Sequence, residues 1–326
     1  MRGLFSSNEK QRRSEPVSSQ LPQHLAPVMR RAERLEWWSI GWTISVIIVM
    51  GATMGSSQAM KTAWIEDCLS LIPPIVFLGA ARIERFSPTS RFPSGFERAP
   101  SLAFAIAASA LTALGGTLLV TSAMSLISQE HATIAAIDVL GHEIWLGWGM
   151  VAAQVYSIIV PIVLGRLKLP LARTLNDKTL FTDAMTQKAN WMTGVAGIGG
   201  IIGIGLGYWW ADAVAAGIIA LDILNDGLRA LRAATAELID GAPRALDSNQ
   251  VADDATALHR SLDARFPGSE IRLRETGRVI RAQIVGAVPP ATDLDPETYW
   301  PGDVDRAWRL AHISFVPPNG TNRTTD

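Results

Sequence analysis

Long apolar runs alternate with polar loops over most of the chain, from about residue 37 to about residue 226. Most of these runs approach or exceed the roughly 20 residues that an α-helix needs to cross the hydrocarbon core of a bilayer. We therefore expect six membrane-spanning helices, at residues 37–55, 64–82, 101–127, 144–164, 181–207 and 211–224.

The pattern changes after residue 226, where charged residues return. The stretch GLRALRAATAELID predicts an amphipathic helix that leaves the membrane, and residues 243–250 indicate a linker. Residues 251–266 carry apolar side chains at helical spacing, whereas EIRLRETG and RVIRAQIVGA alternate like two strands joined at Gly277. We expect VDRAWRLA to form a second helix and HISFV a third strand.

These patterns divide the chain into three parts. A cytoplasmic tail occupies residues 1–34, a transmembrane domain residues 35–240, and a small domain residues 251–326. The expected fold class is an all-α six-helix transmembrane domain followed by a small cytoplasmic α+β domain of the ferredoxin-like type. Because so small a domain buries little apolar core by itself, we expect it to pair with a second copy as a homodimer.

The loops differ sharply in charge. Basic residues fill the tail, the loops after the second and fourth runs and the segment after the sixth, whereas the alternate loops hold only Lys61. By the positive-inside rule both termini are cytoplasmic. The tail lacks the apolar core of a signal peptide, and we expect an integral protein of a bacterial cytoplasmic membrane. A charged fraction of 18% and a net charge of −1 argue for membrane lipid and against nucleic acid as a partner.

Acidic side chains inside the second apolar run are the first candidates for chemistry. Glu66 and Asp67 lie near one end of this run, and Pro73 and Pro74 lie at its middle. Each acid costs about 2.5–3.5 kcal/mol at the centre of a membrane helix, so acids in such places are usually paired or functional. The structural alternative is that the two carboxylates cap the start of a helix, where the helix dipole favours them.

The fifth run repeats the theme. At helical spacing Asp183, Thr186 and Asn190 form one polar stripe, and on the second run Asp67 and Ser70 share a face. Since the two runs point in opposite directions, Asp67 lies near the outer end and Asp183 near the inner end. Two alternatives stay open: Asp183 caps its helix, and the Thr186 and Asn190 side chains hydrogen-bond between helices.

Glycines in the fifth run recur every four residues. Gly199, Gly203 and Gly207 lie in the stretch GVAGIGGIIGIGLG, which is not a nucleotide-binding loop because it is apolar throughout. In a membrane such spacing is typical of a face on which another helix packs closely. We expect close helix packing along these three glycines.

Three short segments carry a family resemblance. GSSQAM precedes the second run, FPSGFERAPS follows it with Pro93, Gly95 and Arg98, and YWWADAVAAGIIALDIL opens the sixth run with Asp212. Together with six spans and a C-terminal α+β domain, they make the chain similar to the cation diffusion facilitator (cation efflux) transporters.

The resemblance implies a metal site between the second and fifth spans, held in that family by two His/Asp positions four residues apart on each. The corresponding positions here are Leu69, Pro73, Thr186 and Asn190, so the usual zinc ligand set is missing. Oxygen donors remain, and they favour a harder ion such as Mn²⁺ or Mg²⁺. The candidate metal ligands are Asp67, Ser70, Glu66, Asp183, Thr186 and Asn190.

The function implied by the resemblance is secondary transport rather than enzymatic catalysis. We expect export of a divalent metal cation in exchange for protons, with the cation as substrate and no resident cofactor. The alternative is a transport-inactive membrane scaffold or regulatory partner that retains the fold.

Overall fold

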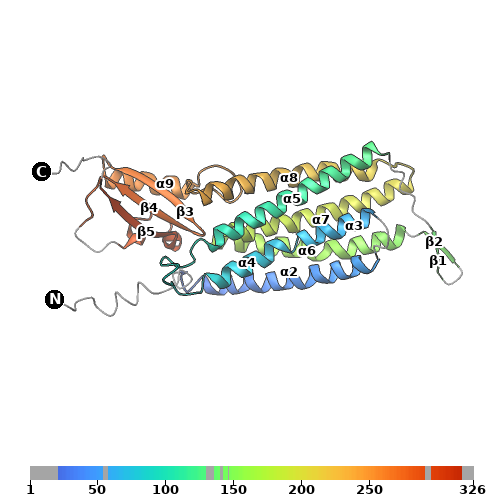
Figure 1. Cartoon of the computed structure of the whole chain (residues 1–326), viewed down its shortest axis with the longest axis horizontal. Helices are drawn as coiled ribbons and strands as arrows, with labels where there is room; N and C mark the ends of the chain where they lie inside the picture. The colour runs from blue at the N-terminus through green and yellow to red at the C-terminus, as the bar shows by residue number, and fades with distance from the viewer. Residues whose placement is uncertain are drawn as a thin grey trace.

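A computed structural model describes residues 21–53, 58–129, 136–139, 142–145, 147–290 and 295–317. Long helices lie side by side in one bundle, and a small sheet domain adjoins one end of that bundle (Figure 1). The first 20 residues of the predicted tail lie outside the described part of the chain, as does residue 318 onward.

Seven helices of the described residues make up the bundle: α2 Ala26–Thr53, α3 Gln58–Leu69, α4 Ile72–Ile83, α5 Ala99–Ile127, α6 Gly147–Leu175, α7 Lys178–Gly205 and α8 Ala211–Leu238. Within the described residues, three segments are long and apolar enough to cross a membrane: Trp64–Ile83, Ala99–Ile127 and Val155–Leu175. They correspond to the second, third and fourth predicted spans.

The second predicted span is two helices rather than one. It breaks at Ser70 and Leu71, between α3 and α4. Pro73 and Pro74 cause the break, since neither has an N–H to donate to the preceding turn, while both are tolerated at the start of a new helix. The break lies beside the candidate carboxylates.

Several helix ends differ from the prediction. Helix α2 begins at Ala26, so the last part of the predicted tail is helical. The predicted start of the fourth span, near Ile144, is wrong, because this residue belongs to strand β2 (His142–Trp145), which pairs with β1 (Ala136–Val139) in a hairpin. Helix α6 therefore starts later and continues past Pro161 to Leu175.

Close packing in the bundle depends on glycines other than those expected. A Cβ on Gly199 or Gly207 would meet nothing within 4 Å, and only Gly203 of the three lies against a neighbour, Ala211. By contrast, a Cβ on Gly115 of α5 would lie 2.5 Å from the backbone nitrogen of Leu224 on α8. A Cβ on Gly227 of α8 would lie 2.7 Å from the backbone of α5, so these two helices touch along their main chains.

The C-terminal domain has the predicted helix and three strands: α9 Asp253–Arg265, β3 Glu270–Thr276, β4 Val279–Val285 and β5 Leu310–Val316. Strands β3 and β4 form an antiparallel hairpin, and β5 joins β4 in parallel, giving the order β3-β4-β5. The hairpin turns at Gly277, whose φ of +61° favours glycine. The expected second helix is wrong as an α-helix, because residues Val304–Arg309 form a short 3₁₀ helix capped by Asp303.

The small domain packs directly on the bundle. Val279 and Trp308 of the domain belong to the same buried apolar cluster as Phe77 of α4 and Leu175 of α6. A separate cluster inside the domain joins α9 to the sheet. The domain therefore buries apolar surface against the membrane helices as well as within itself.

Candidate functional site

Glu66 and Asp67 lie in the last turn of α3, just before the break. Both side chains are half-buried, and neither makes an ion pair or side-chain hydrogen bond within the described part of the chain. The helix dipole places partial negative charge at this end, which favours a cation and opposes a carboxylate. The interpretation of these acids as caps of a helix start is therefore wrong.

The break leaves main-chain carbonyl oxygens, close in sequence to these carboxylates, without their usual helical N–H donors. The buried Ser70 hydroxyl donates to the Asp67 carbonyl oxygen at 2.8 Å, and the Leu71 N–H reaches only the Cys68 carbonyl at 3.3 Å. Pro73 and Pro74 cannot donate to the carbonyls one turn before them. Unwound carbonyls beside carboxylates are a ligand set that transporters use for cations.

Asp183 on α7 belongs to a fully buried ionic cluster. The Lys168 ammonium of α6 donates to Asp183 and, at 2.7 Å, to Glu36 of α2, and all three side chains are completely shielded from solvent. One carboxylate oxygen of Glu36 and one of Asp183 have no hydrogen-bond partner among the described residues. The cluster links α2, α6 and α7 and places the Lys168 ammonium directly against Asp183.

The start of α7 is capped by a different acid. Asp177 accepts a hydrogen bond from the Leu180 N–H at 2.9 Å, just before the helix begins at Lys178. Asp183 lies more than a turn further on, so the alternative that Asp183 caps this helix is wrong. Asp183 instead forms a buried ion pair with Lys168.

Thr186 and Asn190 continue the stripe on α7 as predicted. The buried Thr186 hydroxyl donates to the Thr182 carbonyl of its own helix at 3.2 Å. The half-buried Asn190 amide makes no side-chain hydrogen bond to a described residue. The expected hydrogen bonds between helices are thus absent from both side chains within the described ranges. One turn from Asp183, the Gln187 amide makes such a bond to Ser39 of α2 at 3.0 Å.

The two groups of candidate ligands do not meet in one cluster. Helix α4 packs on α7, whereas α3, which carries the acids, packs on α2 and α5. The Trp64 indole fixes α3 against α2 by donating to the Ile47 carbonyl at 3.2 Å. No group of three or more His, Cys, Asp and Glu side chains with metal-binding spacing occurs in the described residues.

Sequence reasoning missed Glu36 and Lys168. The stretch GRLKLPLAR carries three positive charges within nine residues, which is typical of a polar loop. In the structure α6 extends through this stretch and directs Lys168 inward, while Arg166 faces outward. The available signal was the helical spacing, since two residues along a helix separate side chains by about 200°.

A second ionic cluster lies where the C-terminal domain meets the bundle. Arg278, next to the hairpin turn, donates to Glu84 at 2.8 Å and to Asp177 at 2.7 Å. Burial opposes the charged form of the guanidinium, but Glu84 and Asp177 outweigh this and raise the pKa of Arg278 above its ordinary value. The Gly277 N–H also donates to the Ser101 hydroxyl at 2.9 Å, so the whole turn is held.

Glu275 anchors the other side of the same hairpin. It pairs with Lys178 at the start of α7 and with Arg309 at 3.3 Å, and Lys178 also reaches Glu237 of α8 at 3.2 Å. Burial raises the pKa of Glu275, against the opposing charge of Lys178. The junction between the two domains is therefore charged, buried and largely neutralised.

The comparison with known families fits this architecture. The model described as the cation efflux transmembrane domain matches residues 39–239, which is more than half of the chain. The chain belongs to the cation efflux family. The search of curated proteins found no match.

Membership in the cation efflux family makes the chain an integral membrane protein and a transporter of metal cations in general terms. Two of the motif residues have clear structural roles. Gly95 has a φ of +71°, and Arg98 donates to the Leu238 carbonyl at 3.3 Å and pairs with Asp240 at the end of α8. Asp212 is the second residue of α8, and its side chain lies outside the described part of the structure.

Proposed function

We propose that the protein is a secondary transporter that exports a divalent metal cation in exchange for protons, through a site without the family's His/Asp ligand set. The observation that carries the proposal is the pair Glu66 and Asp67, two half-buried carboxylates without an ion-pair partner among the described residues. Buried acids without partners are costly in a membrane, and a bound cation or proton removes that cost.

The donor chemistry supports a hard cation. Glu66 and Asp67 supply carboxylate oxygens, and the break after Leu69 supplies main-chain oxygens. Sites made of oxygen alone suit Mg²⁺ and Mn²⁺, whereas zinc is usually held by nitrogen or sulfur. We therefore place Mn²⁺ and Mg²⁺ ahead of Zn²⁺ as substrates.

Exchange for protons follows from the same carboxylates. A cation binds the deprotonated acids, so its release on the outer side leaves charges that protons neutralise. Asp183, Thr186 and Asn190 are retained as candidate ligands nearer the inner end of the route. There a cation must displace the Lys168 ammonium from Asp183.

The membrane arrangement belongs to the same proposal. Six spans with cytoplasmic termini account for the loop charges, by the positive-inside rule.

We also infer a homodimer formed through residues 251–326. Removing the residues after Asp240 is expected to weaken the dimer in detergent, and an unchanged monomer mass before and after truncation would refute this contact.

Two observations favour a second candidate function. The described residues contain no cluster of three metal-ligating side chains, and Asp183 already forms an ion pair with Lys168. Both facts fit a membrane scaffold or regulatory partner that retains the fold but has lost transport.

Cation flux into proteoliposomes tests the proposal at Asp67. Asp67→Asn keeps the volume of the side chain and removes its charge, so we expect a folded protein with Mn²⁺ flux near that of empty vesicles. Asp222→Asn is the matched control, because Asp222 is an exposed acid on α8 paired with Lys188 at 3.0 Å. Wild-type flux in Asp67→Asn would show that the site is assigned wrongly.

A further inference from the structure

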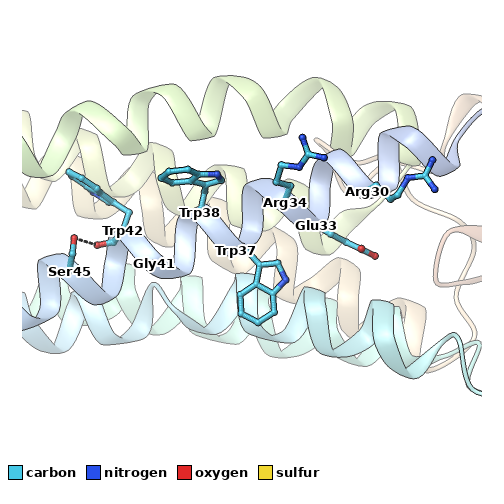
Figure 2. Close-up of a pocket in the computed structure, with 8 residues that line it drawn as sticks. All are labelled: Arg30, Glu33, Arg34, Trp37, Trp38, Gly41, Trp42 and Ser45. Carbon is cyan, nitrogen blue, oxygen red and sulfur yellow. Dashed lines mark hydrogen bonds between the residues drawn. The ribbon is translucent and has the colours of Figure 1, made fainter.

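One face of α2 forms an open groove of about 710 Å³, whose lining side chains are drawn in Figure 2. The N-terminal end of α2 lies at the end of the bundle that adjoins the C-terminal domain (Figure 1). Arg30, Arg34 and Trp38 follow one another at a spacing of four residues, and Gly41, Trp42 and Ser45 continue the same face. Figure 2 shows the two arginines and Trp38 on the same side of the helix, with Trp37 projecting to the other side. Along the helix, this face therefore carries first charged side chains, then an aromatic side chain, and then the bare backbone of Gly41.

The two arginines are exposed and unpaired. Neither Arg30 nor Arg34 makes an ion pair with a described residue, although the intervening Glu33 is close by in sequence. Glu33 is instead paired with Arg85, just beyond α4. Residues four apart on a helix have Cβ atoms about 5–6 Å apart, which allows two guanidinium groups to bind a single phosphate.

The rest of the groove is apolar and wide. Trp37 and Trp38 are 65% and 69% exposed, which is typical of indoles at the boundary between headgroups and acyl chains. A Cβ on Gly41 would meet nothing within 4 Å, so the helix surface is open there. Beyond this notch, Ile48 is also 65% exposed.

This order of chemical groups matches that of a phospholipid molecule. We propose that this face of α2 binds one anionic phospholipid, with its phosphate between Arg30 and Arg34 and an acyl chain lying across Gly41. A basic side chain near an anionic leaflet contributes about 1 kcal/mol, so two arginines favour an anionic over a zwitterionic headgroup. The site is independent of the proposed transport function.

A second copy of the chain fits this face poorly. A two-fold contact presents the same patch on both partners, so it would bring the arginines of both copies together. A free inorganic phosphate also fits less well, because it leaves both exposed indoles and the notch at Gly41 uncovered. These occupants are the alternative outcomes of the test.

Native mass spectrometry of the purified full-length protein in detergent tests the proposal. The probes are phosphatidylglycerol, phosphatidylcholine and inorganic phosphate, each titrated separately. We expect one phosphatidylglycerol molecule to bind with clear preference over phosphatidylcholine. The double variant Arg30→Gln/Arg34→Gln should bind it roughly thirtyfold more weakly, from two contributions of about 1 kcal/mol.

Two further variants make the result specific. Gly41→Leu fills the notch and keeps both charges, so it should weaken phosphatidylglycerol binding without changing the response to inorganic phosphate. Arg82→Gln/Arg91→Gln removes the same charge from exposed positions at and after the end of α4 and should leave binding unchanged. Should the Arg30→Gln/Arg34→Gln protein fail to fold, Gly41→Leu still distinguishes a lipid site from a simple anion site.

Three results would overturn the proposal. Equal binding of the two lipids would exclude recognition of the headgroup charge. Binding of inorganic phosphate that matches phosphatidylglycerol, with no effect of Gly41→Leu, would identify a simple anion site. A lipid-free dimer that Gly41→Leu converts to monomer would show that a second copy covers the face.

Discussion

At the scale of single residues, the Lys168 ammonium holds two carboxylates from different helices in a fully buried position. Removing one partner of a buried ion pair costs about 3–5 kcal/mol, because the remaining charge has no compensation. Glu36 and Asp183 would both lose their partner if Lys168 were replaced. Lys168 therefore stabilises the packing of α2, α6 and α7 against one another.

We predict that Lys168→Met lowers the stability of the protein by about 3–5 kcal/mol, measured as a decrease in Tm in detergent. The triple variant Glu36→Gln/Lys168→Met/Asp183→Asn removes all three charges and should recover part of the loss. Arg166→Met is the matched control, since Arg166 is exposed two residues earlier in α6. A Tm for Lys168→Met equal to that of Arg166→Met would rule out a stabilising role of the buried cluster.

Residue-level reasoning from the sequence identifies candidates where the unusual feature is local. Glu66 and Asp67 stand out as candidates because acids in an apolar run are unusual by themselves. The partners of Asp183 could not be identified in this way, since Glu36 and Lys168 lie 147 and 15 residues away from it. Their contact depends on how three helices pack, which no local pattern encodes.

At the scale of elements, helices α5 and α8 touch along their backbones because glycine replaces a side chain at the crossing. Gly115 lies against the main chain at Leu224, and Gly227 against the main chain at Thr112. Backbone atoms cannot move aside as the end of a flexible side chain can. The close contact therefore tolerates no Cβ at these positions.

We predict that Gly115→Ala destabilises the protein by about 1–3 kcal/mol, the usual cost of overpacking. Gly116→Ala is the control, because a Cβ on the neighbouring Gly116 would meet nothing within 4 Å. That control should be neutral or slightly stabilising, since alanine favours a helix over glycine. Thermal unfolding of both variants in the same detergent gives the comparison, and equal Tm values would refute close packing at Gly115.

Sequence patterns predicted the elements better than their contacts. The apolar runs located the helices, and alternation located the strands of the C-terminal domain with their turn at Gly277. Of the glycine repeat in the fifth run, only Gly203 lies close to a neighbour, because spacing marks a face without saying which helix covers it. The start of α6 was misplaced because Ile144 and Trp145 are as apolar as the helix that follows them.

At the scale of the whole molecule, the C-terminal domain is docked on the bundle through its hairpin turn. Arg278 reaches Glu84 after α4 and Asp177 before α7, so one side chain connects the domain to α4 and to α7, the helix that carries Asp183, Thr186 and Asn190. Nothing in the sequence predicts this junction, because it joins residues 101 and 194 positions apart.

We predict that Arg278→Gln loosens the docked domain, because it leaves Glu84 and Asp177 buried without their partner. Limited proteolysis should then cleave faster between residues 243 and 250, while the bundle remains folded. Arg272→Gln is the control, since Arg272 lies on β3 in an exposed pair with Glu270. Identical cleavage rates for the two variants would show that Arg278 does not hold the domain.

Transport of a divalent cation through an oxygen-ligand site is tested most directly with the wild-type protein in liposomes. Vesicles loaded with a pH indicator and a metal-sensitive dye are given Mn²⁺, Mg²⁺ or Zn²⁺ from outside. We expect entry of Mn²⁺ or Mg²⁺ well above that of empty vesicles and above the Zn²⁺ flux, accompanied by proton movement in the opposite direction. Flux of all three ions at the level of empty vesicles would refute transport and favour the scaffold function.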